Sequence, residues 1–228
     1  MAHEVQLLFD FVSPYSWLAL LQARAFAREH DLCWQVRPVV YAALLDASGL
    51  VGPAESPAKR RYTFRDVQRC AQRLGVALEG PPAHPFRSIE ALRTICLFED
   101  HPRALALAVR LADACWGEGR DLTDVAELAR LVAELDLESD RLARRIATAE
   151  VKAALRRNTE WAVELGVFGV PTFVHHGELF WGHDRLVHLA DHLAGRGPRD
   201  SGGVQRALSR PRGADRKRRP RVDRGDGA

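Results

Sequence analysis

The sequence predicts an α/β chain in which a long helical stretch interrupts a small sheet, and three observations predict this class. The chain opens with a strand, a helix and a second strand, at Val5–Phe11, Pro14 to about His30, and Cys33–Val40. This order makes a parallel β-α-β unit. A long stretch with helical apolar spacing follows. Strand-like residues then return only from Val167 onward.

The first strand runs directly into Ser13-Pro14, where the first helix begins. Val5–Phe11 is almost continuously apolar, as expected of a central strand buried on both faces. Ser13 has the chemistry of an N-cap, and Pro14 suits the first helical position. The free N–H groups and the positive end of the helix dipole then lie beside the Ser13 hydroxyl, which favours an anion there. The alternative is that Ser13 only caps the helix.

The middle of the chain reads as helices joined by loops. Ser48–Pro57 is a loop rich in glycine and proline, and Gly75–Pro85 is an extended connector. Apolar residues elsewhere recur at i, i+3 and i+4. The predicted helices are Ala58–Leu74, Phe86–Phe98, Pro102–Glu118, Thr123–Leu135 and Ser139–Leu165. We therefore expect residues 41–159 to form an all-helical domain inserted into a domain made of residues 1–40 and 160–194.

The chain returns to strands after Gly166, a residue typical of a helix end. Val167–His175 contains Val-Pro-Thr followed by a strand, and His176-Gly177-Glu178 reads as a hairpin turn. Leu179–Trp181 is the returning strand, and Gly182–Leu193 is the closing helix.

Charge is distributed unevenly along the chain. The net charge is +3, but residues 195–228 hold 11 basic and 4 acidic residues, so this tail alone carries +7. The remaining 22 basic and 26 acidic residues give residues 1–194 a net charge of −4. The tail is rich in Arg, Gly and Pro and almost free of large apolar residues, which predicts disorder. Because no aromatic residues interleave its charges, nucleic acid is not expected as a partner.

The cysteines and the lack of long apolar runs predict a cytoplasmic protein. Cys33, Cys70, Cys96 and Cys115 are widely spaced, and none has the spacing of a dithiol or a metal site. We expect buried thiols and no metal. The first residues lack the pattern of a signal peptide, and no stretch approaches the roughly 20 apolar residues of a membrane span. Membrane contact is therefore not expected.

Two segments far apart in the sequence carry a family resemblance. Thioredoxin-like proteins share a plan: a strand leads into x-Pro-x-x at the start of a helix, and much later Val-Pro-Thr precedes another strand. Their redox members have C-x-x-C at that helix start. Here Ser13 and Ser16 occupy the two sulfur positions. The chain resembles the 2-hydroxychromene-2-carboxylate isomerases and the kappa-class glutathione transferases, which are relatives of the DsbA oxidoreductases. The resemblance is carried by three segments, FDFVSPYSWLA, GVFGVPTFV and FWGHDRL. The resemblance runs from about Val5 to about Leu193. It implies a thioredoxin-like domain with a large all-helical insertion.

The resemblance implies a site for glutathione in which Ser13 is the catalytic residue. The Ser13 hydroxyl would hydrogen-bond the glutathione sulfur and favour the thiolate over the thiol, whose ordinary pKa is about 8.5. Pro14 and Tyr15 belong to the same binding segment. Val170-Pro171 would hold a cis peptide bond, and the Val170 backbone would pair with the tripeptide as a strand does. An ordinary trans proline is the alternative.

Two further implied glutathione contacts fall on residues that depart from the family pattern. In the family, the γ-glutamyl end of glutathione typically contacts a Ser-Asp or Asn-Asp pair, and in this sequence the corresponding pair is His183-Asp184. Asp184 matches and suits the α-amino group of the ligand. Leu50 stands where the family often has an Asn that contacts glutathione. These departures favour an alternative, a non-catalytic binding protein of the same fold.

A substrate pocket is predicted from Trp17, Lys59 and Arg60. Trp17, one turn past Ser13, would floor an aromatic pocket, with a core position as the alternative. Lys59 and Arg60 would meet a carboxylate or remain solvated. The resemblance implies a glutathione-dependent isomerase that acts on a small aromatic pyruvate-like acid. A kappa-like glutathione transferase is the alternative. The resemblance also implies a homodimer.

Overall fold

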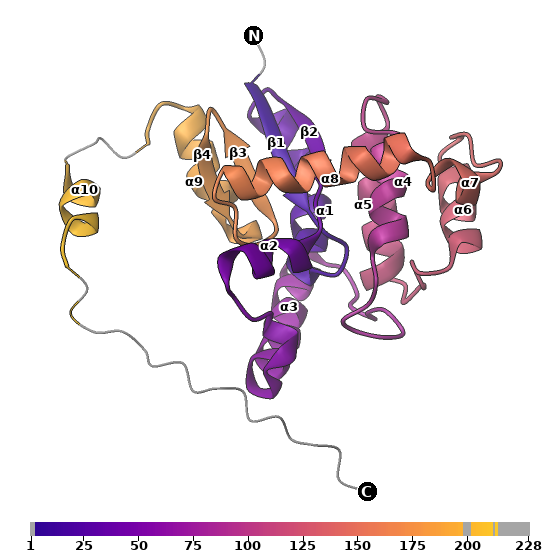
Figure 1. Ribbon diagram of the computed structural model, residues 1–228, viewed down its shortest axis with the longest axis horizontal. Helices are drawn as coiled ribbons and strands as arrows, with labels where there is room; N and C mark the ends of the chain where they lie inside the picture. The colour runs from indigo at the N-terminus through magenta and orange to yellow at the C-terminus, as the bar shows by residue number, and fades with distance from the viewer. Residues whose placement is uncertain (1–2, 198–201, 212, 214–228) are drawn as a thin grey trace, which may run out of the picture.

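A computed structural model of the chain describes residues 3–197, 202–211 and 213, and one mixed four-stranded sheet lies at its centre (Figure 1). The strand order is β2-β1-β3-β4, in which β1 runs parallel to β2 and antiparallel to β3. β3 and β4 form an antiparallel hairpin. The strands are β1 His3–Phe9, β2 Leu32–Pro38, β3 Thr172–His175 and β4 Glu178–Trp181.

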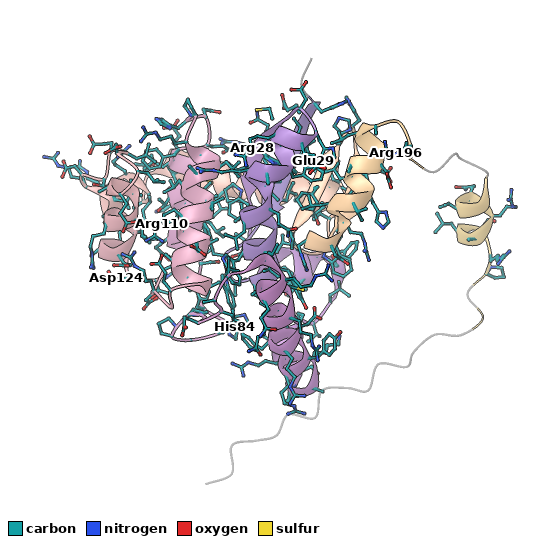
Figure 2. The ribbon with its side chains drawn as sticks, turned by 180° about the vertical axis from the view of Figure 1, so that it is seen from behind. Arg28, Glu29, His84, Arg110, Asp124 and Arg196 are labelled. Atoms are coloured by element: carbon teal, nitrogen blue, oxygen red, sulfur yellow. The ribbon has the colours of Figure 1, made fainter. Side chains whose placement is uncertain are left out.

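The two faces of β1 belong to two different hydrophobic clusters, because successive side chains of a strand point to opposite faces. Val5, Leu7 and Phe9 pack with helix α1 (Pro14–Glu29) and α9 (Leu186–Leu193). Leu8 packs on the other face with α2 (Tyr41–Ser48) and α8 (Ala149–Glu164). Figure 1 shows α8 crossing one face of the sheet, and Figure 2, seen from behind, shows α1 in front of the other.

The helices between β2 and β3 pack into the same two clusters as the sheet. Leu107 and Leu111 of α5 lie in the cluster that holds Leu18 and Leu20 of α1, whereas Leu44 of α2 and Ala162 of α8 lie in the cluster that holds Leu8. The inserted residues therefore extend both clusters of the sheet. Besides α2 and α8, these elements are the 3₁₀ helix η1 Pro53–Glu55, α3 Pro57–Leu74, α4 Ile89–Leu97, α5 Ala104–Trp116, α6 Val125–Ala133 and α7 Leu142–Arg145.

One predicted helix is interrupted in the structure. The sequence predicted a single helix over Ser139–Leu165, but α7 ends at Arg145 and α8 begins at Ala149. The hydroxyl of Thr148 accepts a hydrogen bond from Val151 N at 3.4 Å and so starts a new helix as its N-cap. α8 runs on to Glu164, so the predicted domain boundary between residues 159 and 160 falls inside a continuous helix.

The closing segment and part of the tail also differ from the sequence prediction. The predicted closing helix is split into the 3₁₀ helix η2 (His183–Arg185) and α9. Within the tail predicted to be disordered, residues 203–208 form a short helix, α10 (Gly203–Leu208), with exposed Val204 and Leu208. Residues 198–201, 212 and 214–228 of that prediction lie outside the described residues. Across the described part of the chain, no helix combines the length and the apolar content that a bilayer span requires.

Four histidines gather where β1 begins, β3 ends and α9 ends. His175 is buried, and its Nδ1 lies 3.0 Å from Nε2 of His192. The rings of His3 and His176 contact the His175 ring at centroid distances of 5.3 and 4.1 Å. Burial, and then the charges of these three neighbours, lower the pKa of His175 below its ordinary value of 6.5. Two imidazole nitrogens this close share one proton, so the cluster is stable with His175 neutral.

We expect the protein to lose stability as the pH falls below 6.5. The unfolded chain binds a proton at each histidine below that pH, whereas buried His175 resists protonation, so acid favours unfolding. His175→Phe keeps a buried ring and should reduce the loss between pH 7.5 and 5. Urea unfolding at pH 7.5 and pH 5 measures this loss of stability. His188→Asn, on the exposed face of α9, is the control. An unchanged loss in His175→Phe would contradict the prediction.

Candidate functional site

Ser13 is held by hydrogen bonds to both the first helix and the segment before β3. It is the N-cap of α1, with φ −93° and ψ 116°, and its Oγ accepts from Ser16 N at 3.3 Å. The same Oγ donates to the backbone carbonyl of Val170 at 3.2 Å, although the two residues are 157 positions apart. The structure therefore brings the two segments singled out in the sequence into direct contact.

Val170 precedes a cis peptide bond, as predicted, at Val170-Pro171. Its carbonyl accepts from Ser13, while its N–H has no acceptor among the described residues. The carbonyl of Pro171 accepts from Gly182 N at 2.9 Å, which ties this turn to the start of η2. Gly169 allows the indole of Trp181 to cover the turn, because a Cβ at Gly169 would lie 2.6 Å from Trp181 Nε1.

A cleft of about 1250 Å³ opens beside these residues. Its walls come from the start of α1, from α2 and α3, from the connector after α3, and from the turns around β3 and β4. Its volume is more than the 300–1,000 Å³ typical of small-molecule pockets. The predicted site residues that line it are Ser13, Pro14, Tyr15, Arg60, Val170, Pro171, His183 and Asp184.

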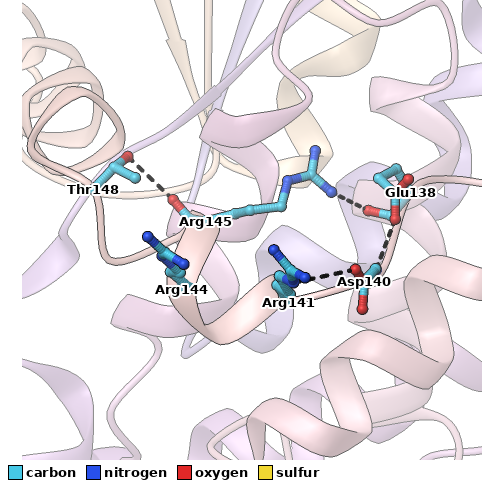
Figure 3. Close-up of a pocket in the computed structure, with 6 residues that line it drawn as sticks. All are labelled: Glu138, Asp140, Arg141, Arg144, Arg145 and Thr148. Carbon is cyan, nitrogen blue, oxygen red and sulfur yellow. Dashed lines mark hydrogen bonds and ion pairs between the residues drawn. The ribbon is translucent and has the colours of Figure 1, made fainter.

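A second hollow, of about 450 Å³, lies on the helical part of the chain between Glu138 and Thr148 (Figure 3). Only polar and charged side chains line it. Arg145 donates to the Glu138 carbonyl, and Arg141 lies 3.5 Å from the Asp140 carboxylate. These contacts are ordinary surface pairs, so the larger cleft is the candidate site.

Tyr15 and His183 form a stacked pair in the cleft. Their rings are 5.5 Å apart and nearly parallel, at 9°. The Tyr15 hydroxyl donates to Asp66 Oδ2 at 2.8 Å, which connects α1 to α3. Burial lowers the pKa of His183, so its imidazole is neutral near pH 7. Asp184 beside it is exposed and forms an ion pair with Arg185 at 2.9 Å.

The expectation that all four thiols are buried is wrong, because Cys33 is exposed and Cys70 and Cys96 are only partly buried. Cys70, on α3, lines the cleft. Burial, followed by the nearby charge of Asp66, raises the pKa of Cys70 above its ordinary value of 9.0. The thiol is therefore protonated near neutral pH, and a protonated thiol is a poor nucleophile. The cleft has room for a reactive sulfur beside Ser13, but Cys70 does not supply a thiolate.

The whole folded region matches a known family. The model of the DSBA-like thioredoxin domain matches residues 4–194. The chain belongs to this family. Its four-stranded mixed sheet with many helices is thus a DsbA-type thioredoxin-like fold, and the predicted fold class is confirmed.

Several relatives in this family are enzymes of two kinds. A 2-hydroxychromene-2-carboxylate isomerase of Pseudomonas putida is 34% identical over 191 residues, covering 81% of this chain and 91% of that protein. Glutathione S-transferase kappa 1 of Homo sapiens is 30% identical over 208 residues, covering 84% and 90%. A solved structure of 2-hydroxychromene-2-carboxylate isomerase superposes with a TM-score of 0.78 at 27% identity, covering 84% of this chain and 95% of that one. The predicted family resemblance is confirmed.

Three predicted site residues of this DsbA-like chain do not line the cleft. Trp17 is 0% exposed, and its Nε1 donates to Asp113 Oδ1 of α5 at 3.1 Å. The prediction that Trp17 floors a substrate pocket is corrected, because α5 covers that side of α1. Leu50 is 49% exposed and Lys59 is exposed, and both lie outside the cleft walls. Arg60, next in sequence, does line the cleft.

The sequence analysis missed an aromatic wall of the cleft around His84. The Nε2 of His84 lies 3.0 Å from the Val12 carbonyl, and its ring contacts Phe64 and Trp116 edge-on. Figure 2 shows His84 beside α3. Burial lowers the pKa of His84, so the ring is neutral and Nε2 carries the proton donated to Val12. No spacing in the sequence joins these residues, since they come from three separate segments.

Asp10 was also missed, although the sequence held a signal for it. It is a carboxylate in an apolar run, it is 2% exposed, and it lines the cleft. Charged side chains are almost never fully buried without partners. A lone acid in such a strand therefore predicts a polar network beside Ser13.

Proposed function

We propose that this chain is a glutathione-dependent isomerase of the 2-hydroxychromene-2-carboxylate type. One observation carries the proposal: the Ser13 hydroxyl caps α1 inside the cleft, 3.2 Å from the Val170 carbonyl, with serines at both positions of the family dithiol. A protein built this way forms no disulfide between these two positions. In the proposed reaction the sulfur comes from a small molecule instead.

Ser13 and the start of α1 are the groups suited to hold a thiolate. The Ser13 hydroxyl donates to the Val170 carbonyl at 3.2 Å, and it would donate to a bound thiolate in place of that carbonyl, because a hydrogen bond to an anion is stronger than one to a neutral acceptor. α1 has 16 residues and no acidic side chain in its first turn, so its positive end is uncompensated by its own residues. Both effects favour the thiolate over the thiol.

The other cleft residues fit the backbone and the ends of a tripeptide. The unpaired N–H of Val170 and its carbonyl suit the pairing of an extended peptide along the turn. His183, stacked on Tyr15, presents a neutral imidazole at one end of this line. Asp184 beside it offers a carboxylate for an ammonium group.

The opposite wall suits an aromatic acid. Phe64 and Phe86 line it, and the guanidinium of Arg60 lies 5.1 Å from the Phe64 ring centroid. An aromatic ring of the substrate would lie against these side chains with its carboxylate toward Arg60. Bound glutathione would supply a thiolate that adds reversibly to the conjugated double bond, permits rotation, and leaves. The groups of this chain orient both molecules and stabilise the negative charge.

Two other functions use the same cleft. A kappa-like glutathione transferase is supported by the identity with the human kappa enzyme, and it would transfer the sulfur without releasing it. A binding protein without catalysis is supported by His183 and by the exposure of Leu50, which leave two family contacts changed. The predicted homodimer and cytoplasmic location stay predictions.

A calorimetric titration with glutathione, followed by two assays, tests the proposal. We expect saturable glutathione binding, isomerisation of 2-hydroxychromene-2-carboxylate only when glutathione is present, and little reaction with a chlorinated aromatic acceptor. Conjugation of the chlorinated acceptor without isomerisation would favour the transferase. No heat and no thermal shift up to several millimolar glutathione would favour the binding protein.

A further inference from the structure

Asp10 is a buried carboxylate that accepts hydrogen bonds on both of its oxygens. It follows β1 and lines the cleft three residues before Ser13. Its Oδ1 accepts from Val12 N at 3.0 Å, and its Oδ2 accepts from Tyr41 N at 2.9 Å. Its backbone carbonyl accepts from Ser13 N at 3.1 Å. Asp10 therefore fixes the turn that places the Ser13 hydroxyl.

The same carboxylate reaches the starts of two inserted helices. Tyr41 is the first residue of α2, whose own N-cap, Val40, has no side chain that can accept a hydrogen bond. Ser88 is the N-cap of α4, makes no capping bond to its own helix, and hydrogen-bonds the Asp10 carboxylate. Negative charge at a helix N-terminus is stabilising. Asp10 supplies this charge to α2 and α4 from outside both helices.

Keeping this carboxylate buried has an energetic cost that its hydrogen bonds offset only in part. Burial raises the pKa of Asp10 above its ordinary value of 3.8, and the hydrogen bonds from Ser88, Tyr41 and Val12 oppose the rise. A buried charge is tolerated when its hydrogen bonds are satisfied. An apolar residue would fill this space without that cost. The carboxylate therefore has a role beyond filling the end of the strand.

We propose that Asp10 is a positioning residue that holds the Ser13 turn and the starts of the inserted helices α2 and α4 in one fixed arrangement beside the cleft. Ser13, Tyr41 and Ser88 all line the cleft, and Asp10 joins their three segments. It therefore sets where α2, α4 and the Phe86 side chain just before α4 lie relative to a sulfur at Ser13. The effect on turnover rests on the proposed function, whereas the effect on the backbone does not.

The substitution Asp10→Asn separates positioning from simple space-filling. Two backbone N–H groups donate to different oxygens of the Asp10 carboxylate, Val12 N to Oδ1 and Tyr41 N to Oδ2. Asparagine has the same shape but only one oxygen, so its NH₂ group must face one of the N–H donors. Asp124→Asn is the matched control, because the Asp124 carboxylate caps α6 by accepting from one backbone N–H, that of Ala126 at 2.8 Å, and its other oxygen lies 3.9 Å from Arg130. Figure 2 shows Asp124 well away from His84, which lines the cleft.

Hydrogen–deuterium exchange and steady-state kinetics on the full chain provide the readouts. In Asp10→Asn we expect exchange at Val12 and Tyr41 to rise at least tenfold. We also expect turnover with glutathione and the chromene acid to fall by a factor of about 10 to 100, as misplacement of reacting groups does. Asp124→Asn should leave turnover and exchange at these amides unchanged. Asp10→Glu, which restores two oxygens, should recover part of the turnover.

Ser88→Ala keeps the test decisive if Asp10→Asn does not fold. It removes only the contact with α4, so we expect faster exchange in residues 89–92 and a KM for the aromatic acid raised severalfold at nearly unchanged kcat. The proposal would be overturned if Asp10→Asn kept the wild-type exchange rates and turnover. It would also be overturned if Ser88→Ala kept the wild-type exchange rates and KM. If the wild-type chain neither binds glutathione nor isomerises the chromene acid, the proposed function fails. The exchange data still decide the role of Asp10 in that case.

Discussion

Replacing Ser13 by alanine should lower turnover by about 100-fold or more while leaving the chain folded. The loss of one preorganised donor to a developing anion has this magnitude in other enzymes. Ser13 Oγ is a hydroxyl donor at the start of α1, and it donates to the Val170 carbonyl at 3.2 Å. Without it, a thiol at the start of α1 loses its hydrogen bond and reverts toward the protonated form.

The stability cost of Ser13→Ala must be separated from this catalytic loss, and Thr148 provides the control. The Thr148 hydroxyl accepts from Val151 N at 3.4 Å and donates to the Arg145 carbonyl at 3.1 Å. Ser13 makes the same pair of contacts, to Ser16 N and Val170 O. Loss of an N-cap costs about 1 kcal/mol, so both alanine variants should be similarly destabilised.

Stopped assays of kcat/KM with glutathione, and urea unfolding of both variants, check this expectation. Only Ser13→Ala should lose turnover. With glutathione disulfide, the thiolate of Ser13→Cys should form a mixed disulfide and release one glutathione thiolate, a reaction that Ser13 of the wild-type chain cannot undergo. Equal turnover in wild type and Ser13→Ala would remove Ser13 from the mechanism. Equal loss in Thr148→Ala would assign the effect to helix capping in general.

The parts of the site that local chemistry fixes could be predicted from the sequence. Ser13-Pro14 is a capping pattern that needs no knowledge of distant residues, and the structure places the helix start there. The cis bond before Pro171 followed from the family resemblance and is present. Even the break at Thr148 has a local signal, since a threonine before an acidic residue within a helical run is a candidate N-cap.

The parts that depend on distant packing could not be predicted in the same way. His84 joins the site only because the connector after α3 lies against Val12 and Trp116. Asp10 gave a local signal, a charge in an apolar strand, but its partners Tyr41 and Ser88 come from two other segments. Helical spacing places Trp17 on one face of α1, but it does not say which element covers that face.

Trp17 provides the second large effect, because the structure makes it a core residue and not a substrate contact. Its indole is 0% exposed, lies in the continuous core, and donates to Asp113 Oδ1 at 3.1 Å. Trp17→Ala should therefore reduce the free energy of unfolding by about 3–5 kcal/mol, as the removal of a buried aromatic ring does. It also leaves the Asp113 carboxylate without this donor. That loss is a large fraction of the 5–15 kcal/mol that stabilises a typical domain.

Trp181 is the matched control, since its side chain is 52% exposed and does line the cleft. Trp181→Ala should cost little stability and should change KM for a cleft ligand. Trp17→Phe should lower stability less than Trp17→Ala and leave kcat/KM per folded molecule unchanged. Urea unfolding and kinetics of the three variants measure both effects. A raised KM at native stability in Trp17→Phe would instead return Trp17 to the substrate pocket, and α5 would then have to move away from α1 during turnover.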